Sequence, residues 1–296
     1  STYVQAAPGD HKGYEYARTQ NPTRDVLQKN LAALEGTKYG LCFSTGMGAV
    51  DACAKLLSPG DEVVSTNDLY GGTYRLFTKI FAQYGIKFHF VDMSNEQAVR
   101  SVMSDRVKMV WVETPTNPLL RIIDIELMIR IGHEHKSLVV VDNTFASPYL
   151  QNPAKMGADI VMHSATKYIN GHSDVVMGVL CVSDDALRDR LAFIQNSCGA
   201  TPGPTLGAAG AVAGAGVVAV VAGAVACAAA ALASAVCFIC AILATFIPFH
   251  PLAILGYFIL WLAGLWLSKN LDKFQIIEQD YDSNIFWTSL ILISAF

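Results

Sequence analysis

The sequence predicts an α/β fold with a largely parallel sheet over residues 25 to 185, followed by an all-α apolar segment. Short apolar runs alternate with amphipathic helical stretches, and these runs lack the period-two pattern of strands with one solvent-facing side. A change in composition marks the second part, because no Asp, Glu, Lys or Arg occurs from Leu191 to Ser268. A chain of 296 residues is long enough for about two domains.

The predicted elements of the first part follow one another in a regular order. The stretch DVLQKNLAALEG, residues 25–36, has the spacing of an amphipathic helix. The runs that suit buried strands are YGLCFST (39–45), DEVVST (61–66), KMVWVET (108–114), SLVVVDN (137–143) and DIVMHSA (159–165). Ligands of such sheets bind where strands end and helices begin, so we expect functional residues directly after these runs.

Two of these strand ends carry groups that can bind a ligand. Gly46 and Met47 follow the first run and precede a helical stretch, and the free N–H groups of a helix start can bind an anion. A tight turn without a ligand would explain the glycines equally well. Asp142 ends another run, where its carboxylate needs a cationic or hydrogen-bonding partner unless it caps a turn.

A third strand end carries hydroxyl groups and a lysine. Ser164 and Thr166 can hold a phosphate, and Lys167 can bind an aldehyde covalently as a Schiff base. A lysine at the mouth of a buried strand is ordinarily solvated, and its charge is costly to bury unless it is paired or reacts. Together with Asp142 and the glycine turn, these groups predict pyridoxal 5'-phosphate as the cofactor. Tyr70, in NDLYGGTYR, could stack on its pyridine ring, although a core tyrosine is the alternative.

Residues 1 to about 204 closely resemble the Cys/Met-metabolism family of fold-type I pyridoxal-phosphate enzymes, and within it cystathionine γ-lyase and γ-synthase. The motifs that carry this resemblance are YEYARTQNPTR, STGMGA, DLYGGTYR, VETPTNP, VVDNTFASP and SATKYINGHSDVVMG. It implies a carbon–sulfur lyase or transferase that acts on cystathionine or an O-acylhomoserine by γ-elimination or γ-replacement. Cleavage of cystathionine is the first candidate reaction, and cystathionine, a homoserine ester or cysteine would be the substrate.

The resemblance also implies a role for each site residue. Lys167 would bind the cofactor and then carry protons, and Asp142 would face the pyridine nitrogen. Tyr70 would stack on the ring and help in acid–base catalysis. The phosphate would be held by backbone groups at Gly46 and Met47, by the hydroxyls of Ser164 and Thr166, and, from a neighbouring subunit, by Tyr16 and Arg18. Glu113 and Asn117 would line the substrate side. Because a neighbour completes the site, we expect a homodimer or homotetramer.

The composition excludes several other classes of function. The net charge is −4 and no basic tract occurs, so we expect no nucleic-acid partner. The cysteines lack the paired spacing of a disulfide framework, which favours a reducing, cytoplasmic setting for the enzyme domain, and the first residues do not form a secretory signal. Cys237 and Cys240 have no second pair, and His133 and His135 suit an exposed helix end, so we expect no metal site.

The second part of the chain departs from the family. The family has several dozen residues before the point that matches Ser1, and after residue 204 it has a small α/β domain whose arginine binds the substrate carboxylate. This chain has no arginine after Arg190. Residues 205–268 are instead apolar, with candidate membrane spans at 207–226, 227–247 and 252–268, and residues 269–296 read as a polar linker with a short apolar tail. A membrane segment is therefore predicted, with a set of buried core helices as the alternative.

Three hypotheses for the whole chain follow. The first is a transsulfuration enzyme domain, truncated and joined to a membrane segment, either naturally or by an error of gene model or assembly. The second is a membrane-anchored, catalytically inactive derivative that still binds the cofactor or serves as an interaction surface. The third is a membrane protein in which the enzyme-like part has no function, and the density of motifs makes it the weakest.

Overall fold

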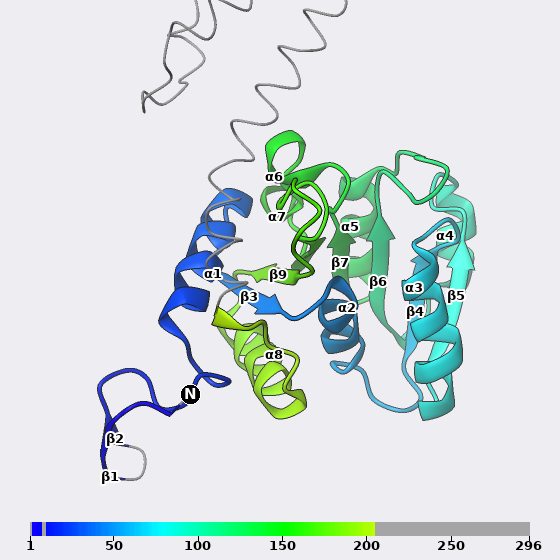
Figure 1. Cartoon of the computed structure of the whole chain (residues 1–296). Helices are drawn as coiled ribbons and strands as arrows, with labels where there is room; N and C mark the ends of the chain where they lie inside the picture. The colour runs from blue at the N-terminus through cyan, green and yellow to red at the C-terminus, as the bar shows by residue number, and fades with distance from the viewer. Residues whose placement is uncertain (1, 8–9, 205–296) are drawn as a thin grey trace, which may run out of the picture. The chain divides into compact units, whose positions relative to one another are not determined.

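The computed structural model describes residues 2–7 and 10–204. Within these residues, seven strands form one sheet in the order β3-β9-β8-β7-β6-β4-β5 (Figure 1). The strands are β3 (Tyr39–Phe43), β4 (Glu62–Thr66), β5 (Lys87–Val91), β6 (Val107–Glu113), β7 (Leu138–Asp142), β8 (Ile160–Ser164) and β9 (Gly178–Val182). Neighbouring strands from β5 to β8 pair in parallel, whereas β9 runs antiparallel to β3 and β8. The predicted α/β fold with a mostly parallel sheet is confirmed.

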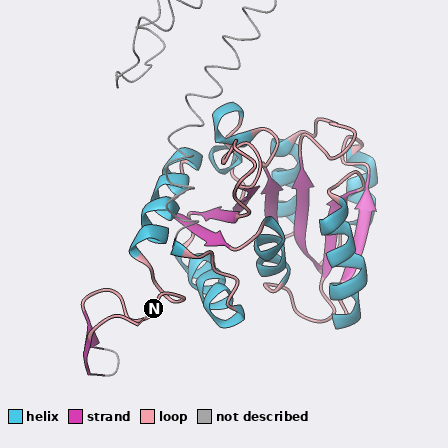
Figure 2. Cartoon of the chain, in the orientation of Figure 1, coloured by secondary structure: helices cyan, strands magenta, loops and turns pink. Residues whose placement is uncertain are grey.

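Helices cover both faces of this sheet (Figure 2). One face packs against α2 (Gly46–Ala54), α8 (Asp185–Cys198) and the segment that contains α3 (Gly71–Arg75), which continues as a π-helix (Leu76–Ile80) and a 3₁₀ helix (Phe81–Tyr84). The other face packs against α1 (Pro22–Glu35), α4 (Glu96–Val102), α5 (Ile125–Glu134) and α7 (Pro153–Met156). The short helix α6 (Ser147–Leu150) follows β7.

The central strands are buried on both sides, which explains their uninterrupted apolar sequences. In β7, Val140 packs with the α2 side of the sheet, while Val139 and Val141 pack with the α5 side. All three side chains are fully buried. Successive side chains of a strand point to opposite faces, so a strand covered twice needs apolar residues at every position.

The predicted helix over 25–36 begins three residues earlier in the structure. The Asn21 side chain accepts hydrogen bonds from the N–H groups of Thr23 and Arg24, and Pro22 occupies the first turn. The helix ends at Gly36, whose φ of 74° is a left-handed conformation that favours glycine. The start was missed because the cap lies outside the apolar pattern.

Other elements lie beyond the runs singled out in the sequence. The strands β5 and β9 complete the sheet, and a small antiparallel pair joins β1 (Gln5–Ala7) to β2 (Asp10–His11). The antiparallel β9 places its first residue beside the loop that precedes α2, which matters for the site described below.

The predicted membrane segment lies outside the residues that the structure describes. In residues 2–7 and 10–204, no helix combines the length and the apolar character that crossing a membrane requires. The candidate spans, the polar linker and the apolar tail all fall within residues 205–296, outside the described residues, as do Cys237 and Cys240.

Candidate active site

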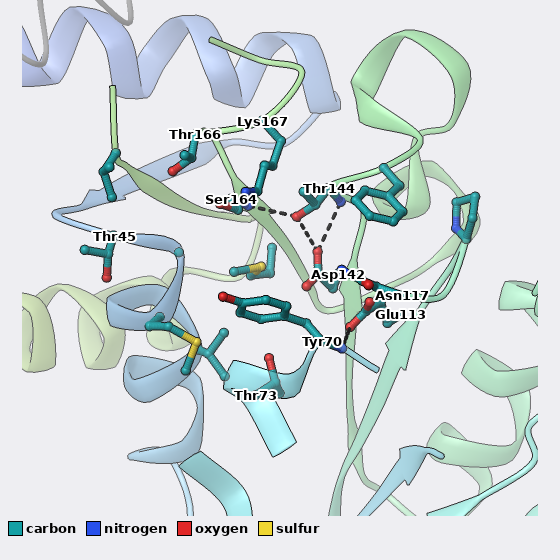
Figure 3. A pocket seen from close by; sticks show the side chains of 17 residues that line it. Thr45, Tyr70, Thr73, Glu113, Asn117, Asp142, Thr144, Ser164, Thr166 and Lys167 are labelled. Atoms are coloured by element: carbon teal, nitrogen blue, oxygen red, sulfur yellow. Dashed lines mark hydrogen bonds between the residues drawn. The ribbon is translucent and has the colours of Figure 1, made fainter. Parts of the chain in front are cut away.

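A pocket of about 370 Å³ opens at the carboxyl ends of β6, β7 and β8 (Figure 3). It brings together all the site residues predicted from the sequence except Tyr16 and Arg18. Those that line it are Gly46, Met47, Tyr70, Glu113, Asn117, Asp142, Ser164, Thr166 and Lys167. Thr45, Val50, Thr73, Pro115, Thr144, Phe145, Met162 and Val176 complete the lining. The parallel arrangement explains this convergence, because strands far apart in the sequence end at the same edge of the sheet.

Asp142 is buried at the end of β7 and is held by the residue two positions after it. Its Oδ1 atom accepts hydrogen bonds from the Thr144 backbone N–H at 3.1 Å and from the Thr144 hydroxyl at 2.5 Å. The Thr144 Oγ1 atom in turn accepts a hydrogen bond from the Ser164 N–H at 2.8 Å, as Figure 3 shows. Thr144 therefore links the ends of β7 and β8 and orients the carboxylate.

Glu113 is buried beside Asp142, at the end of the neighbouring strand. Its Oε2 atom accepts a hydrogen bond from the Tyr70 backbone N–H at 2.9 Å. Burial, reinforced by the nearby charge of Asp142, raises the pKa of Glu113 to about 9. Burial also raises the pKa of Asp142, but both hydrogen bonds from Thr144 oppose that rise. The Thr144 hydrogen bonds therefore favour the ionised form of Asp142, whereas burial beside Asp142 favours the neutral form of Glu113.

The start of α2 forms a second wall of the pocket. Thr45 caps the helix, accepting a hydrogen bond from the Gly48 N–H at 2.8 Å, and the following N–H groups lie at the positive end of the helix. A Cβ atom on Gly46 would lie 2.9 Å from Ser164 Oγ, so glycine is required for this close approach. A Cβ on Gly178 would likewise clash with the Thr45 carbonyl oxygen. The strands β8 and β9 thus approach the helix start closely, and Gly46 and Met47 of this helix start line the pocket, where free N–H groups can bind an anion.

Lys167 lies in a turn beyond the end of β8. Its N–H donates to the Ser164 carbonyl at 3.1 Å, and its own carbonyl accepts from the Gly171 N–H at 2.8 Å. Lys167 is exposed in this turn and lines the pocket, and in Figure 3 its side chain points toward Ser164. Among the described residues, Lys167 is the only basic residue that lines the pocket.

Tyr70 contributes an aromatic face on the opposite side. Its side chain is about half exposed, at 46%, so the alternative of a core tyrosine is excluded. Its ring packs closely on Gly72, where a Cβ atom would clash with it. Below the ring in Figure 3, the Thr73 hydroxyl is buried and has no hydrogen-bond partner in the described part of the chain.

Tyr16 and Arg18 lie away from the pocket. Tyr16 is 46% exposed and forms an isolated bridge with Thr2, and the Arg18 guanidinium lies 5.5 Å from the centre of the Tyr16 ring. Neither residue lines the pocket of this chain. Their expected contribution to a neighbouring subunit's site stays a prediction.

Three threonines of the site were not singled out from the sequence. Thr144 holds Asp142, Thr45 caps α2, and Thr73 lies under Tyr70. Thr144 could have been found, because an aspartate commonly accepts a hydrogen bond from the residue two positions later. Thr45 has the ordinary signature of a helix cap, whereas nothing in the sequence marks Thr73. No group of three potential metal ligands occurs among the described residues.

Comparisons with known proteins give a consistent family assignment. Residues 1–210 match the model of a family described as Cys/Met metabolism PLP-dependent enzyme. The chain is 51% identical over 204 residues to a probable cystathionine gamma-synthase of Herpetosiphon aurantiacus, and 49% identical over 205 residues to human cystathionine gamma-lyase. A crystal structure of cystathionine gamma synthase from Xanthomonas oryzae pv. oryzae, in complex with aminoacrylate and cysteine, superposes with a TM-score of 0.72 at 40% identity.

The matched region is only part of each protein. It covers 69% of this chain and 64% and 51% of the two curated relatives, and the structural match covers 74% of this chain and 57% of the crystallised one. The chain therefore spans between half and two-thirds of the length of the proteins that it matches.

Proposed function

The chain belongs to the Cys/Met-metabolism family of enzymes that depend on pyridoxal phosphate, and we propose that it breaks or forms the carbon–sulfur bond of cystathionine. The reaction would be γ-elimination from cystathionine or γ-replacement on an O-acylhomoserine with cysteine. The two curated relatives carry the names of both activities, at 51% and 49% identity. Cleavage of cystathionine remains the first candidate, with binding of the cofactor without turnover as the alternative.

One observation carries this proposal: Lys167, Asp142 and Tyr70, which are far apart in the sequence, line a single pocket. When bound, pyridoxal phosphate supplies an aldehyde that bonds amines and a protonated ring that withdraws electrons from a substrate carbon. The residues present fit that group. The pocket offers an amine, a buried carboxylate, an aromatic face and a helix start whose free N–H groups can bind a phosphate.

Each residue would act through an atom that the structure presents to the pocket. Lys167 Nζ would hold the aldehyde covalently and later take up and return protons, which its exposed position allows. The Asp142 carboxylate, whose ionised form the Thr144 hydrogen bonds favour, would bind the protonated ring nitrogen. Tyr70 would pack on the ring and assist proton transfer through its hydroxyl.

The remaining pocket residues would either bind the phosphate or line the substrate side. The Gly46 and Met47 N–H groups and the Ser164 and Thr166 hydroxyls would bind the phosphate. In the described structure the Thr166 hydroxyl accepts a hydrogen bond from the Met177 N–H at 3.0 Å, which orients it toward the loop. Glu113 and Asn117 would line the substrate side, with Glu113 in its neutral form at neutral pH.

We further propose that the site is completed in a homo-oligomer. Lys167 is the only basic residue among the described pocket lining, which leaves a doubly charged phosphate without a cationic side chain once the lysine is bound. Arg18, with Tyr16, would supply that charge from a neighbouring subunit. The exposure of Tyr16 leaves it free to make such a contact.

Parallel assays would test the proposed reaction. The full chain, loaded with pyridoxal phosphate, would be given L-cystathionine in one assay and O-succinylhomoserine with cysteine in another, with a Lys167→Ala variant as the control. We expect turnover in at least one assay and none by the variant. Cofactor binding without turnover of either substrate would instead support the inactive alternative.

A further inference from the structure

A buried polar cluster lies on the opposite face of the sheet from the pocket, directly behind Asp142. Its members are Glu35 at the end of α1, His163 in β8 and Asn143 immediately after β7. Their exposed fractions are 0%, 1% and 0%, so water does not solvate them. Burying three polar side chains in this way is costly unless they bond to one another.

One carboxylate oxygen joins the three residues. Glu35 Oε1 is bonded to His163 Nε2 at 2.5 Å and accepts a hydrogen bond from Asn143 Nδ2 at 3.0 Å. The cluster therefore ties α1 to the ends of β7 and β8 through a single acceptor atom. Both His163 Nδ1 and Glu35 Oε2 are buried without a further partner in the described residues, so the bonds at Oε1 are the ones that hold the cluster.

Successive side chains of β8 point to opposite faces of the sheet, so the cluster lies behind the pocket and does not line it. Met162 and Ser164 line the pocket, and His163, which lies between them, points to the α1 side. In the same way, Asp142 faces the pocket while Asn143, its neighbour, faces Glu35. A shift of His163 or Asn143 would therefore move the pocket residue that is next to it in the chain.

A fourth residue extends the cluster to the neighbouring strand. Gln151 Nε2 donates to Asn143 Oδ1 at 2.9 Å and to the Thr114 carbonyl at 3.4 Å, and the Gln151 carbonyl accepts from Asn143 Nδ2 at 2.9 Å. Thr114 directly follows Glu113. Asn143 directly follows Asp142, so Gln151 joins the residues that follow both pocket carboxylates in one hydrogen-bond network.

We propose that Glu35, His163 and Asn143 are positioning residues for the proposed cofactor site, where they hold Asp142 in place to bind a protonated ring nitrogen. This role rests on the proposed function. A positive charge on His163 would act in the same direction, since it lowers the pKa of Asp142 and so favours the ionised form. Second-layer groups that orient metal ligands change affinity by about 10- to 100-fold, and we expect an effect of that order here.

Two nearly isosteric substitutions would test the role in the full chain. Glu35→Gln removes the charge and keeps an acceptor for Asn143, and His163→Gln removes the imidazole and keeps a donor. We expect both to raise the dissociation constant for pyridoxal phosphate about 10- to 100-fold, measured by absorbance titration. Val161→Ala, which alters the same face of β8 without touching the cluster, should leave it within about threefold. Unchanged affinity in a folded Glu35→Gln or His163→Gln variant would overturn the proposal.

A second measurement does not depend on the cofactor and separates this proposal from the proposed function. A double-mutant cycle would combine His163→Gln with Asp142→Asn in the cofactor-free chain and compare midpoints of thermal unfolding. We expect non-additive shifts, because His163 acts on the Asp142 carboxylate, whereas Val161→Ala and Asp142→Asn should be additive. Additive shifts for the His163 pair would overturn the positioning role, even if the parent chain binds pyridoxal phosphate.

Discussion

Glu113 and Asp142 are register partners at the carboxyl ends of the parallel strands β6 and β7, so two buried carboxyl groups lie side by side in the pocket. Two such groups cannot both carry a charge at low cost. Thr144 donates two hydrogen bonds to Asp142, whereas Glu113 accepts one hydrogen bond from the Tyr70 N–H. This difference favours the ionised form at Asp142, while Glu113 has a pKa raised to about 9.

The raised pKa of Glu113 predicts a pH-dependent stability. Its pKa is about 9 in the folded chain against an ordinary value of 4.5, so the folded state binds more protons than the unfolded state between these values. The contribution of Glu113 to stability is therefore present below about pH 4.5 and is lost as pH rises toward 9. Between pH 4.5 and 9, we expect the unfolding temperature of Glu113→Gln to fall less than that of the parent chain.

Thermal unfolding of the cofactor-free chain at several pH values would measure this effect. One kcal/mol corresponds to about 2–4 °C for a domain of this size, so a loss of several degrees should separate the parent from the variant. Glu96→Gln, at an exposed ion pair on α4, serves as the control and should follow the parent curve. Equal pH dependence in parent and Glu113→Gln would show that Glu113 titrates normally.

Thr144→Val should weaken both the site and the fold. The substitution keeps the shape of the side chain but removes the hydroxyl that donates to Asp142 and accepts from the Ser164 N–H. A buried polar group left without its partner costs about 1–3 kcal/mol, and we expect a loss of that size together with weaker cofactor binding.

Chemical denaturation and a cofactor titration would measure the two effects of Thr144→Val. Thr78→Val removes a hydroxyl that makes one surface bond, to the Tyr74 carbonyl, and should change neither quantity appreciably. If Thr144→Val behaved like Thr78→Val, the link between β7 and β8 would have no energetic importance.

Gly178→Ala should displace the loop that precedes α2. The added methyl group would collide with the backbone of Thr45, which cannot move as a flexible side chain can. Overpacking of this kind costs about 1–3 kcal/mol, and it should also reduce affinity for pyridoxal phosphate because the helix start shifts. Gly203→Ala, where nothing lies within 4 Å of the new atom, is the matched control. Normal affinity in Gly178→Ala would show that the approach of β9 does not shape the phosphate site.

The sequence was sufficient to predict those features that follow from local patterns. Apolar runs without period two predicted strands covered on both faces, and the residues directly after them predicted most of the pocket. The turn that holds Lys167 at the pocket wall was not predicted, because strand patterns do not describe turns. The cluster around Glu35 was also missed, since Glu35 and His163 are 128 positions apart and only the packing of α1 on β8 brings them together.

Some site residues act on a near neighbour in the sequence, and others meet only in the folded sheet. Thr144 acts on Asp142 across two positions and has a sequence signature, whereas Glu113 meets Asp142 only through strand pairing. Its raised pKa depends on burial and on that neighbour, so no motif alone could reveal it.

Lys167 is proposed to hold pyridoxal phosphate covalently in a pocket with Asp142 and Tyr70. Borohydride reduction of the cofactor-loaded full chain, followed by digestion and peptide mass spectrometry, tests it most directly because reduction makes the bond to the lysine permanent. We predict a phosphopyridoxyl group on the peptide that contains Lys167, and its disappearance in a Lys167→Arg variant. A label on a different lysine, or no label in a folded chain supplied with excess cofactor, would contradict the claim.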